Sequence, residues 1–216
     1  MKRSILQEAV QGKLVPHLES DGNTDKLCEK IYAEKKSLLE QGVIKKPKKN
    51  YVIDSDEDIP FEIPENWSWV KLMDICYLQD GVKQDGKNVL LDAKFLRGKT
   101  SATYLNSGKF VKKGEDVILV DGENSGEVFS VPQDGYMGST FKKLIINKEL
   151  YKPYVLLQLL NYKYFLRNSK KGAAIPHLNK ELFYNLMIGV PPISEQKRIV
   201  KKVEELFKAI DSMNLK

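Results

Sequence analysis

The sequence contains few cysteines and histidines, and their scarcity argues against several classes of protein. Its 216 residues include two cysteines, Cys28 and Cys76, whose spacing matches neither a disulfide framework nor a metal site. His17 and His177 are the only histidines and are too few to form a metal site of their own. These absences predict a reduced, cytoplasmic protein that binds no metal.

Long apolar runs are also missing. No stretch reaches the length that is needed to cross a membrane. The residues after Met1 mix polar and apolar side chains in an amphipathic pattern, which is not the pattern of a signal peptide. We therefore expect neither secretion nor a membrane partner.

The composition is that of a globular protein with a basic balance. Hydrophobic residues make up 42% and charged residues 30% of the chain, which leaves room for a real core. The 35 Lys and Arg residues exceed the 29 Asp and Glu residues, so the net charge is +6. A positive charge favours polyanionic partners such as nucleic acid, although many basic proteins bind none.

Two motifs come close to enzyme signatures, and each lacks a necessary residue. The stretch 81–88 fits G-x-x-x-x-G-K, but Asn88 stands where a P-loop needs Ser or Thr for Mg²⁺, and no helix start follows. We therefore expect a glycine turn with basic side chains. Val190 precedes Pro191 and Pro192, whereas an amino-methyltransferase needs Asn or Asp before its two prolines to hold the target amine. The methyltransferase interpretation fails for this reason.

Acidic residues gather between residues 116 and 127, where a metal-dependent nuclease could hold its cation. They lack the Glu-x-Lys pairing of such enzymes, and carboxylates on a strand and the following turn are more often surface residues or turn formers. We expect no catalysis from this segment, and a nuclease stays a less favoured alternative. The residues concerned are Asp116, Asp121, Glu123 and Glu127.

The apolar pattern divides the chain into four segments. We expect helices within 1–43, a charged linker over 44–66, a compact domain over 67–192 and a final helix over 193–216. The first segment should hold two helices, over 3–14 and 25–41. The predicted elements of the compact domain are strands over 117–120, 128–131, 141–146 and 186–190 and helices over 153–165 and 179–183. Strands mixed with a few helices, without regular alternation, indicate an α+β fold.

The final helix begins after two prolines and carries an apolar stripe. Ser194 is expected to be its N-cap, and Glu195 lies where a negative charge meets the positive end of the helix dipole. Apolar residues recur at spacings of four, three, four and three, which suits either ordinary core packing or a two-helix coiled coil. The stripe consists of Ile199, Val203, Leu206, Ile210 and Met213, widened by Val200 and Phe207.

Several of these stretches resemble a known family. Residues 191–200, PPISEQKRIV, resemble the PP-x-x-EQ-x-x-I start of the spacer helix in type I restriction–modification specificity subunits. Residues 4–16, SILQEAVQGKLVP, are similar to the close of the spacer region in those subunits. Residues 67–72, 114–118 and 172–180 resemble parts of a target-recognition domain.

The resemblance implies a non-catalytic protein that reads double-stranded DNA and docks a methyltransferase, and through it a restriction subunit. S-adenosylmethionine would then bind the methyltransferase, and this chain would bind no cofactor. A full-length subunit has two reading domains, whereas this chain has one flanked by pieces of spacer, so it looks like half a subunit. A truncated module that occupies the methyltransferase without reading DNA is the alternative.

Two sets of residues follow as candidate sites. Basic and amide side chains in the loops of the compact domain suit phosphate and base contacts, although a solvated loop explains them almost as well. They are Lys83, Lys87, Asn124, Ser125, Lys142, Lys143, Lys170, Lys171, His177 and Asn179. Because Lys142 and Lys143 are neighbours on a strand, only one of them should face DNA.

The second set lies on the terminal helices, which the resemblance places in one antiparallel spacer. In a lone chain the two apolar seams would be half covered, so we expect a homodimer or pairing with another half subunit. The residues are Ile5, Leu6, Ala9, Val10, Ile199, Val203, Leu206, Phe207, Ile210 and Met213.

Overall fold

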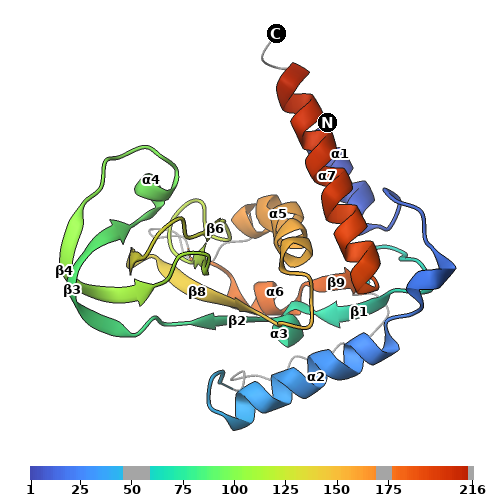
Figure 1. Cartoon of the computed structure of the whole chain (residues 1–216), viewed down its shortest axis with the longest axis horizontal. Helices are drawn as coiled ribbons and strands as arrows, with labels where there is room; N and C mark the ends of the chain where they lie inside the picture. Colours follow the sequence, from blue (N-terminus) through green and yellow to red (C-terminus); the bar gives the residue numbers. More distant parts are fainter. Residues whose placement is uncertain (46–58, 169–176, 214–216) are drawn as a thin grey trace. The chain divides into compact units, whose positions relative to one another are not determined.

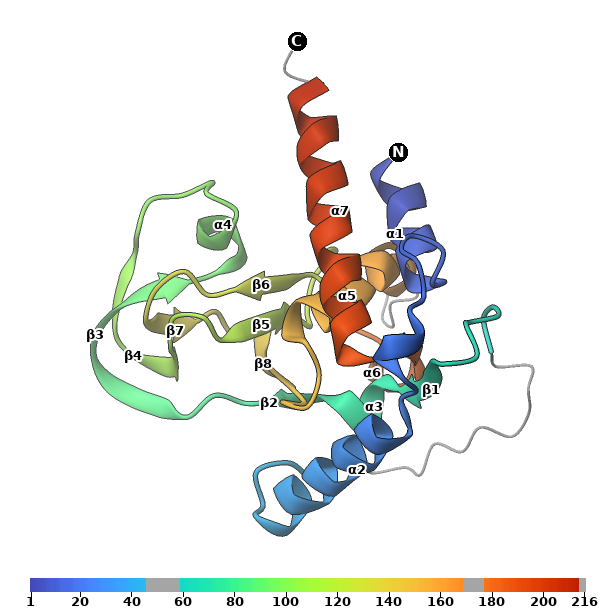
Figure 2. The same cartoon turned by 45° about the vertical axis from the view of Figure 1, so that its right-hand side comes forward.

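The computed structural model describes residues 1–45, 59–168 and 177–213, and the chain forms two compact units (Figures 1 and 2). The first unit contains Met1–Ile75, Ile146–Asn161 and Tyr184–Lys216, and the second contains Cys76–Ile145 and Tyr162–Phe183. Helices and strands mix in both, which confirms the α+β class. The four segments expected from the sequence were assigned by their expected roles, whereas these units are groups of residues that contact one another. The boundaries of the four segments therefore stay a prediction.

The first unit is mostly helical. A ladder joins β1 (Ser68–Lys71) to β9 (Met187–Val190) in antiparallel register, with Ser68 opposite Val190. Around the ladder lie α1 (Lys2–Val10), the 3₁₀ helix η1 (Glu19–Asp21), α2 (Asp25–Glu40), α3 (Leu72–Ile75), the first part of α5 (Lys152–Asn168) and α7 (Ile193–Met213). No helix in the described ranges is long and apolar enough to span a membrane.

The terminal helices α1 and α7 pack against each other in antiparallel directions (Figure 2). Lys2 at the start of α1 pairs with Asp211 near the end of α7 at 2.6 Å and lies 5.0 Å from the centre of the Phe207 ring. Leu6 and Ala9 are buried with Ile199 and other residues of α7 in one apolar cluster. We expected a lone chain to leave both apolar seams half covered. For these buried residues the expectation is wrong, because α1 and α7 of one chain cover each other. A coiled coil in the strict sense stays a prediction.

The first turn of α7 is held by buried polar groups. Glu195 is 0% exposed, and His17 Nδ1 and Trp67 Nε1 lie 2.7 and 3.1 Å from its Oε1. Asn66 donates to the other carboxylate oxygen at 3.3 Å. Gln196, also buried, accepts from the backbone N–H of Tyr151 and donates to the Pro191 carbonyl. The Glu-Gln pair of the motif therefore joins α7 to three distant segments of the unit.

Ser194 is not the N-cap that the sequence suggested. Helix α7 already begins at Ile193, and the Ser194 hydroxyl donates to Asp21 Oδ1 at 2.6 Å instead of accepting from the first turn. Arg198, one turn further on, donates to both carboxylate oxygens of Asp21. These contacts attach η1 to α7.

Asp21 gives a pH-dependent prediction. Hydrogen bonds from Arg198 outweigh burial and lower the pKa of Asp21 from 3.8 to about 2. A depressed pKa stabilises the fold above the unfolded value, and that stability is lost as pH falls from about 4 to about 2. Since the side chain is 4% exposed, we expect Asp21→Asn to lower the free energy of unfolding by about 2 kcal/mol at pH 7.

Urea unfolding at several pH values checks this prediction. The difference between wild type and Asp21→Asn should persist at pH 5 and shrink below pH 4. Glu19→Gln, in the exposed first residue of the same 3₁₀ helix, is the matched control and should change stability by less than about 0.5 kcal/mol. A difference that does not shrink in acid would contradict the assigned role of the carboxylate.

The second unit consists of a sheet and a small barrel. The sheet has the order β2 (Cys76–Gln79), β8 (Phe141–Ile146), β5 (Asp116–Leu119) and β6 (Val128–Ser130). The barrel contains β3 (Lys83–Leu91), β4 (Tyr104–Val111) and β7 (Gly135–Met137), with α4 (Ala93–Leu96) after β3. The rest of α5 and most of α6 (Lys180–Asn185) complete the unit.

One apolar core supports this unit. Its buried residues come from the barrel and from the sheet, which both direct β-branched and aromatic side chains inward. They are Val89, Leu91, Val111, Val117, Leu119, Val131, Met137 and Phe141. The predicted strands over β5, β6, β8 and β9 are confirmed, as are helices over α1, α2, α5, α6 and α7, whereas β2, β3, β4 and β7 were missed.

Candidate nucleic-acid interface

Strands β3 and β4 form a long antiparallel ribbon in the second unit (Figure 2). Its residues 83–87 and 104–106 are exposed. Lys83 lies opposite Lys109 and Asp85 opposite Ser107, and after an irregularity the register resumes with Asn88 opposite Leu105. Strand β7 pairs with β3 at residues 90–91 and with β4 at residues 109–111. The described residues thus leave the middle of the ribbon with no third strand.

Tyr136 of β7 contacts both strands of the ribbon in its middle section. Its side chain is 0% exposed, and its hydroxyl donates to the carbonyl of Gly86 at 2.6 Å. Gly108, on the other strand, lies so close that a Cβ there would come within 2.6 Å of the Tyr136 ring. The buried Tyr136 side chain therefore holds the middle of the ribbon in one position.

The ribbon presents cationic, amide and aromatic side chains to solvent. Lys87 Nζ lies 5.3 Å from the centre of the Tyr104 ring, which is 58% exposed, and such cation–π contacts fix a flexible lysine. Lys83 and Lys87 form no ion pair with any other residue that the structure describes. Gln84, Asp85 and Asn106 are also exposed. Positive charge beside amide groups suits the phosphates and base edges of DNA.

This ribbon corrects the sequence-based description of residues 81–88. The stretch was expected to form a glycine turn, but residues 83–88 are extended and belong to β3. Gly86 has a φ of 123° at the irregular position, where the ribbon bulges. Strand β3 continues to Leu91, so no helix starts directly after residue 88 and the argument against a P-loop holds.

Lys142 and Lys143 of β8 point to different carboxylates, as neighbours on a strand must. Lys142 and Lys109 both pair with Asp80, and their hydrogen bonds lower the pKa of Asp80 to about 2. Lys143 pairs with Glu115. Either lysine would have to exchange its carboxylate partner for a phosphate to contact DNA. Contact between these two lysines and DNA therefore stays a prediction.

Four more of the predicted residues lie in two places, Asn124 and Ser125 in the turn after β5 and His177 and Asn179 just before α6. Ser125 is 0% exposed, and its hydroxyl finds no partner among the described residues, so as placed here it cannot contact a duplex. Asn124 next to it is half-buried. His177 is exposed, and its Nδ1 lies 2.7 Å from Asp121 Oδ1. Asn179 accepts from the backbone N–H of Leu182 and so caps α6.

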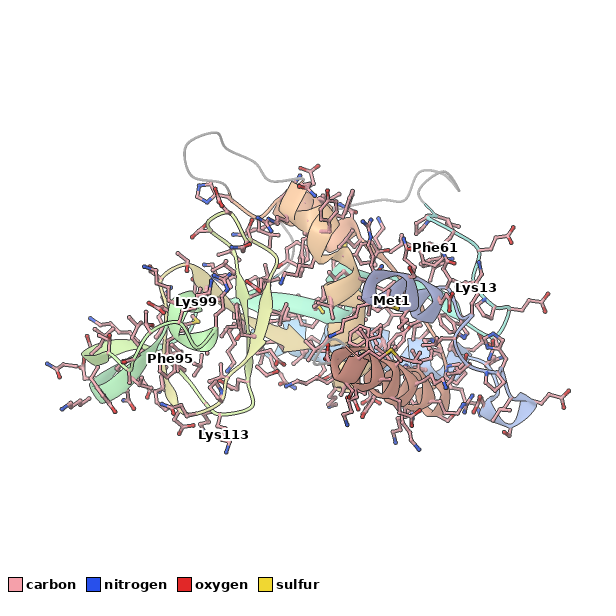
Figure 3. All side chains as sticks on the ribbon, turned by 90° about the horizontal axis from the view of Figure 1, so that it is seen from above. Met1, Lys13, Phe61, Phe95, Lys99 and Lys113 are labelled. Atoms are coloured by element: carbon pink, nitrogen blue, oxygen red, sulfur yellow. The ribbon has the colours of Figure 1, made fainter. Side chains whose placement is uncertain are left out.

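Two predicted contacts, Lys170 and Lys171, lie outside the described residues. Figure 3 labels two further exposed lysines of the second unit, Lys99 after α4 and Lys113 in the turn between β4 and β5. Sequence reasoning missed Gln84, Tyr104 and Asn106 as candidates. The contact between Lys87 and Tyr104 joins separate strands, and no local pattern in the sequence signals it.

The carboxylates considered for a nuclease have other partners. Asp116 is buried and accepts from the Ser130 hydroxyl at 2.6 Å. Burial alone would raise the pKa of Glu127, but hydrogen bonds from Lys163 and Arg97 hold it below its usual value. Within residues 1–45, 59–168 and 177–213, no three acidic, histidine or cysteine side chains gather in a way that could hold a metal ion.

Comparison with known proteins assigns the family. Residues 64–216 match the model of the type I restriction modification DNA specificity domain. Since this match covers well over half of the chain, the protein belongs to that family, as the resemblance at the two ends of the sequence indicated.

Named relatives agree with this assignment. The chain is 29% identical to the EcoAI specificity subunit of Escherichia coli, over 99% of this chain and 40% of that subunit. It is 30% identical to the MjaVIII specificity subunit of Methanocaldococcus jannaschii, over 70% of this chain and 38% of that subunit. The HsdS subunit of Thermoanaerobacter tengcongensis shares the fold, with a TM-score of 0.54 at 17% identity over 88% of this chain and 46% of that one. The chain thus spans about two fifths of the length of the curated relatives it matches.

Proposed function

We propose that this chain is the DNA-recognition subunit of a type I restriction–modification system and directs a partner methyltransferase to one DNA sequence. The observation that carries the proposal is the family match over residues 64–216, which includes the whole second unit and α7. Its role is to choose the site and not to perform chemistry. S-adenosylmethionine then belongs on the methyltransferase, and a restriction subunit joins through the same complex.

The basic ribbon supports a DNA partner in the second unit. Lys83 and Lys87 are exposed and lack carboxylate partners among the described residues, so their charge is available to phosphates. Neutralising phosphates releases counterions, which makes such binding strong at low salt and weak at high salt. The charge therefore supplies affinity, and the neighbouring polar groups supply a choice of sequence.

We further propose that two such chains, or this chain and another half subunit, act together on a bipartite site. Curated relatives are more than twice as long as the segment matched here, and a two-part site needs two reading domains. Two identical domains related by a two-fold axis read inverted half-sites. On α7, the partly exposed Leu206 and the 67% exposed Met213 remain for a partner helix. Since the proposed partners are DNA and a methyltransferase, we expect the complex to act in the cytoplasm.

Selection of duplexes by the purified chain tests this function. From a pool with a randomised segment, we expect one sequence to be enriched and bound roughly a thousandfold more tightly than random DNA. Binding should weaken steeply with salt, and the chain alone should neither methylate nor cut the DNA. Equal retention of all sequences would overturn the proposal and favour a module that occupies the methyltransferase without reading DNA.

A further inference from the structure

The middle of the β3–β4 ribbon differs from the other strands of the second unit in its exposure. Five consecutive residues of β3, from Lys83 to Lys87, are exposed, whereas all four residues of β5 are buried. Exposed strand edges often carry lysine because its charge blocks pairing with another chain. That explanation accounts for the lysines but not for the amide, carboxylate and aromatic side chains beside them.

We propose that this exposed section lies in the major groove of DNA, where Gln84 and Asn106 contact bases and Lys83 and Lys87 contact the flanking phosphates. The inference rests on the proposed function and names the element that reads the sequence. A two-stranded ribbon has the width to enter the major groove, which is about 12 Å across.

The side chains match what the groove offers. Gln84 lies opposite Gly108, two residues from Asn106, so both amides lie on one face of the ribbon. Each amide can donate to and accept from one adenine edge. The lysines add charge that does not depend on sequence. Tyr104, two residues from Asn106 on β4, is 58% exposed and supplies apolar surface of the kind that meets a thymine methyl group.

The ribbon is also rigid enough to keep its register on bases. Strand β7 fixes both of its ends, and Tyr136 holds the backbone of Gly86 and packs under Gly108. Base contacts require side chains on a fixed backbone, because otherwise ordering the ribbon on binding would reduce the affinity. Lys87 is further restrained by its contact with Tyr104.

Two double variants of the full chain separate the roles. Gln84→Ala with Asn106→Ala should reduce affinity for the selected duplex by roughly 10-fold to 100-fold and relax the preference at one or two base pairs, while binding of random DNA stays unchanged. Lys83→Ala with Lys87→Ala should weaken binding to all duplexes and lower the slope of log affinity against log salt by about two. All positions are exposed, so thermal unfolding should be nearly unchanged.

Lys26→Ala with Lys30→Ala, on the exposed side of α2, removes the same charge elsewhere and should leave the slope unchanged. If wild-type protein selects a sequence and both ribbon variants keep that sequence, affinity and slope, the inference is overturned while the proposed function stands. The lysines would then only protect a strand edge. A wild-type chain that selects no sequence overturns the proposed function and this inference with it.

Discussion

Replacing Glu195 by alanine should lower the free energy of unfolding by about 3 kcal/mol. The carboxylate is completely buried and has Trp67, Asn66 and His17 within hydrogen-bond distance. Hydrogen bonds to a charged group contribute about 1.5–3 kcal/mol each, and a buried donor left without a partner costs about 1–3 kcal/mol. The indole N–H of Trp67 has no route to water once the carboxylate is gone, since Trp67 is 5% exposed.

Urea unfolding followed by tryptophan fluorescence measures this effect, because Trp67 itself reports the change. Glu204→Ala, on the exposed side of the same helix, is the matched control and should stay within about 0.5 kcal/mol of wild type. Glu195→Gln should fall between the two, because its amide oxygen still accepts from Trp67 whereas its NH₂ group faces another donor. If Glu195→Ala unfolds at the same urea concentration as Glu204→Ala, the network does not hold α7 in place.

The structure also explains how far the motif at the end of the chain could be understood from sequence. Two prolines and a heptad-like stripe are local signals, and they located the start of α7 to within two residues. The structural role of Glu195 could not be predicted from local sequence, because its hydrogen-bond partners His17 and Trp67 lie far from it in the chain. A charge near a helix start was the only interpretation that the local pattern allowed.

Strands were predicted where apolar residues run together and missed where they do not. Strands β5 and β8 contain buried β-branched and aromatic residues, whereas the first five residues of β3 are polar and exposed. Such a strand forms because β4 and β7 pair with it, and pairing between distant segments leaves no period in the sequence. Gly135 illustrates this, since a Cβ there would lie 2.6 Å from the carbonyl oxygen of Val89 on β3.

The candidate site was predicted in part for the same reason. Lys83 and Lys87 were chosen for their charge and glycine neighbours, and they lie on the exposed ribbon. Ser125 was chosen by residue type alone, and the tight turn between Gly122 and Gly126 buries it. Charge predicts surface position well, whereas a small polar residue is placed by the backbone around it.

The largest functional effect is expected in the complex with the methyltransferase. When the methyltransferase subunit of the same system is produced with this chain, methylation should be confined to one bipartite sequence. Without the chain, that sequence should lose essentially all of its methylation, since the enzyme then has no means of choosing it. The ribbon variant Gln84→Ala with Asn106→Ala should retain the complex and relax the methylated sequence.

Mapping every methylated base in the DNA of cells that carry the methyltransferase, with and without this chain, is the most direct test that the chain selects the site. The expected result is one sequence methylated at nearly every occurrence when the chain is present, and at none when it is absent. The same set of methylated positions in both cells, or positions that share no sequence, would contradict a role in DNA recognition.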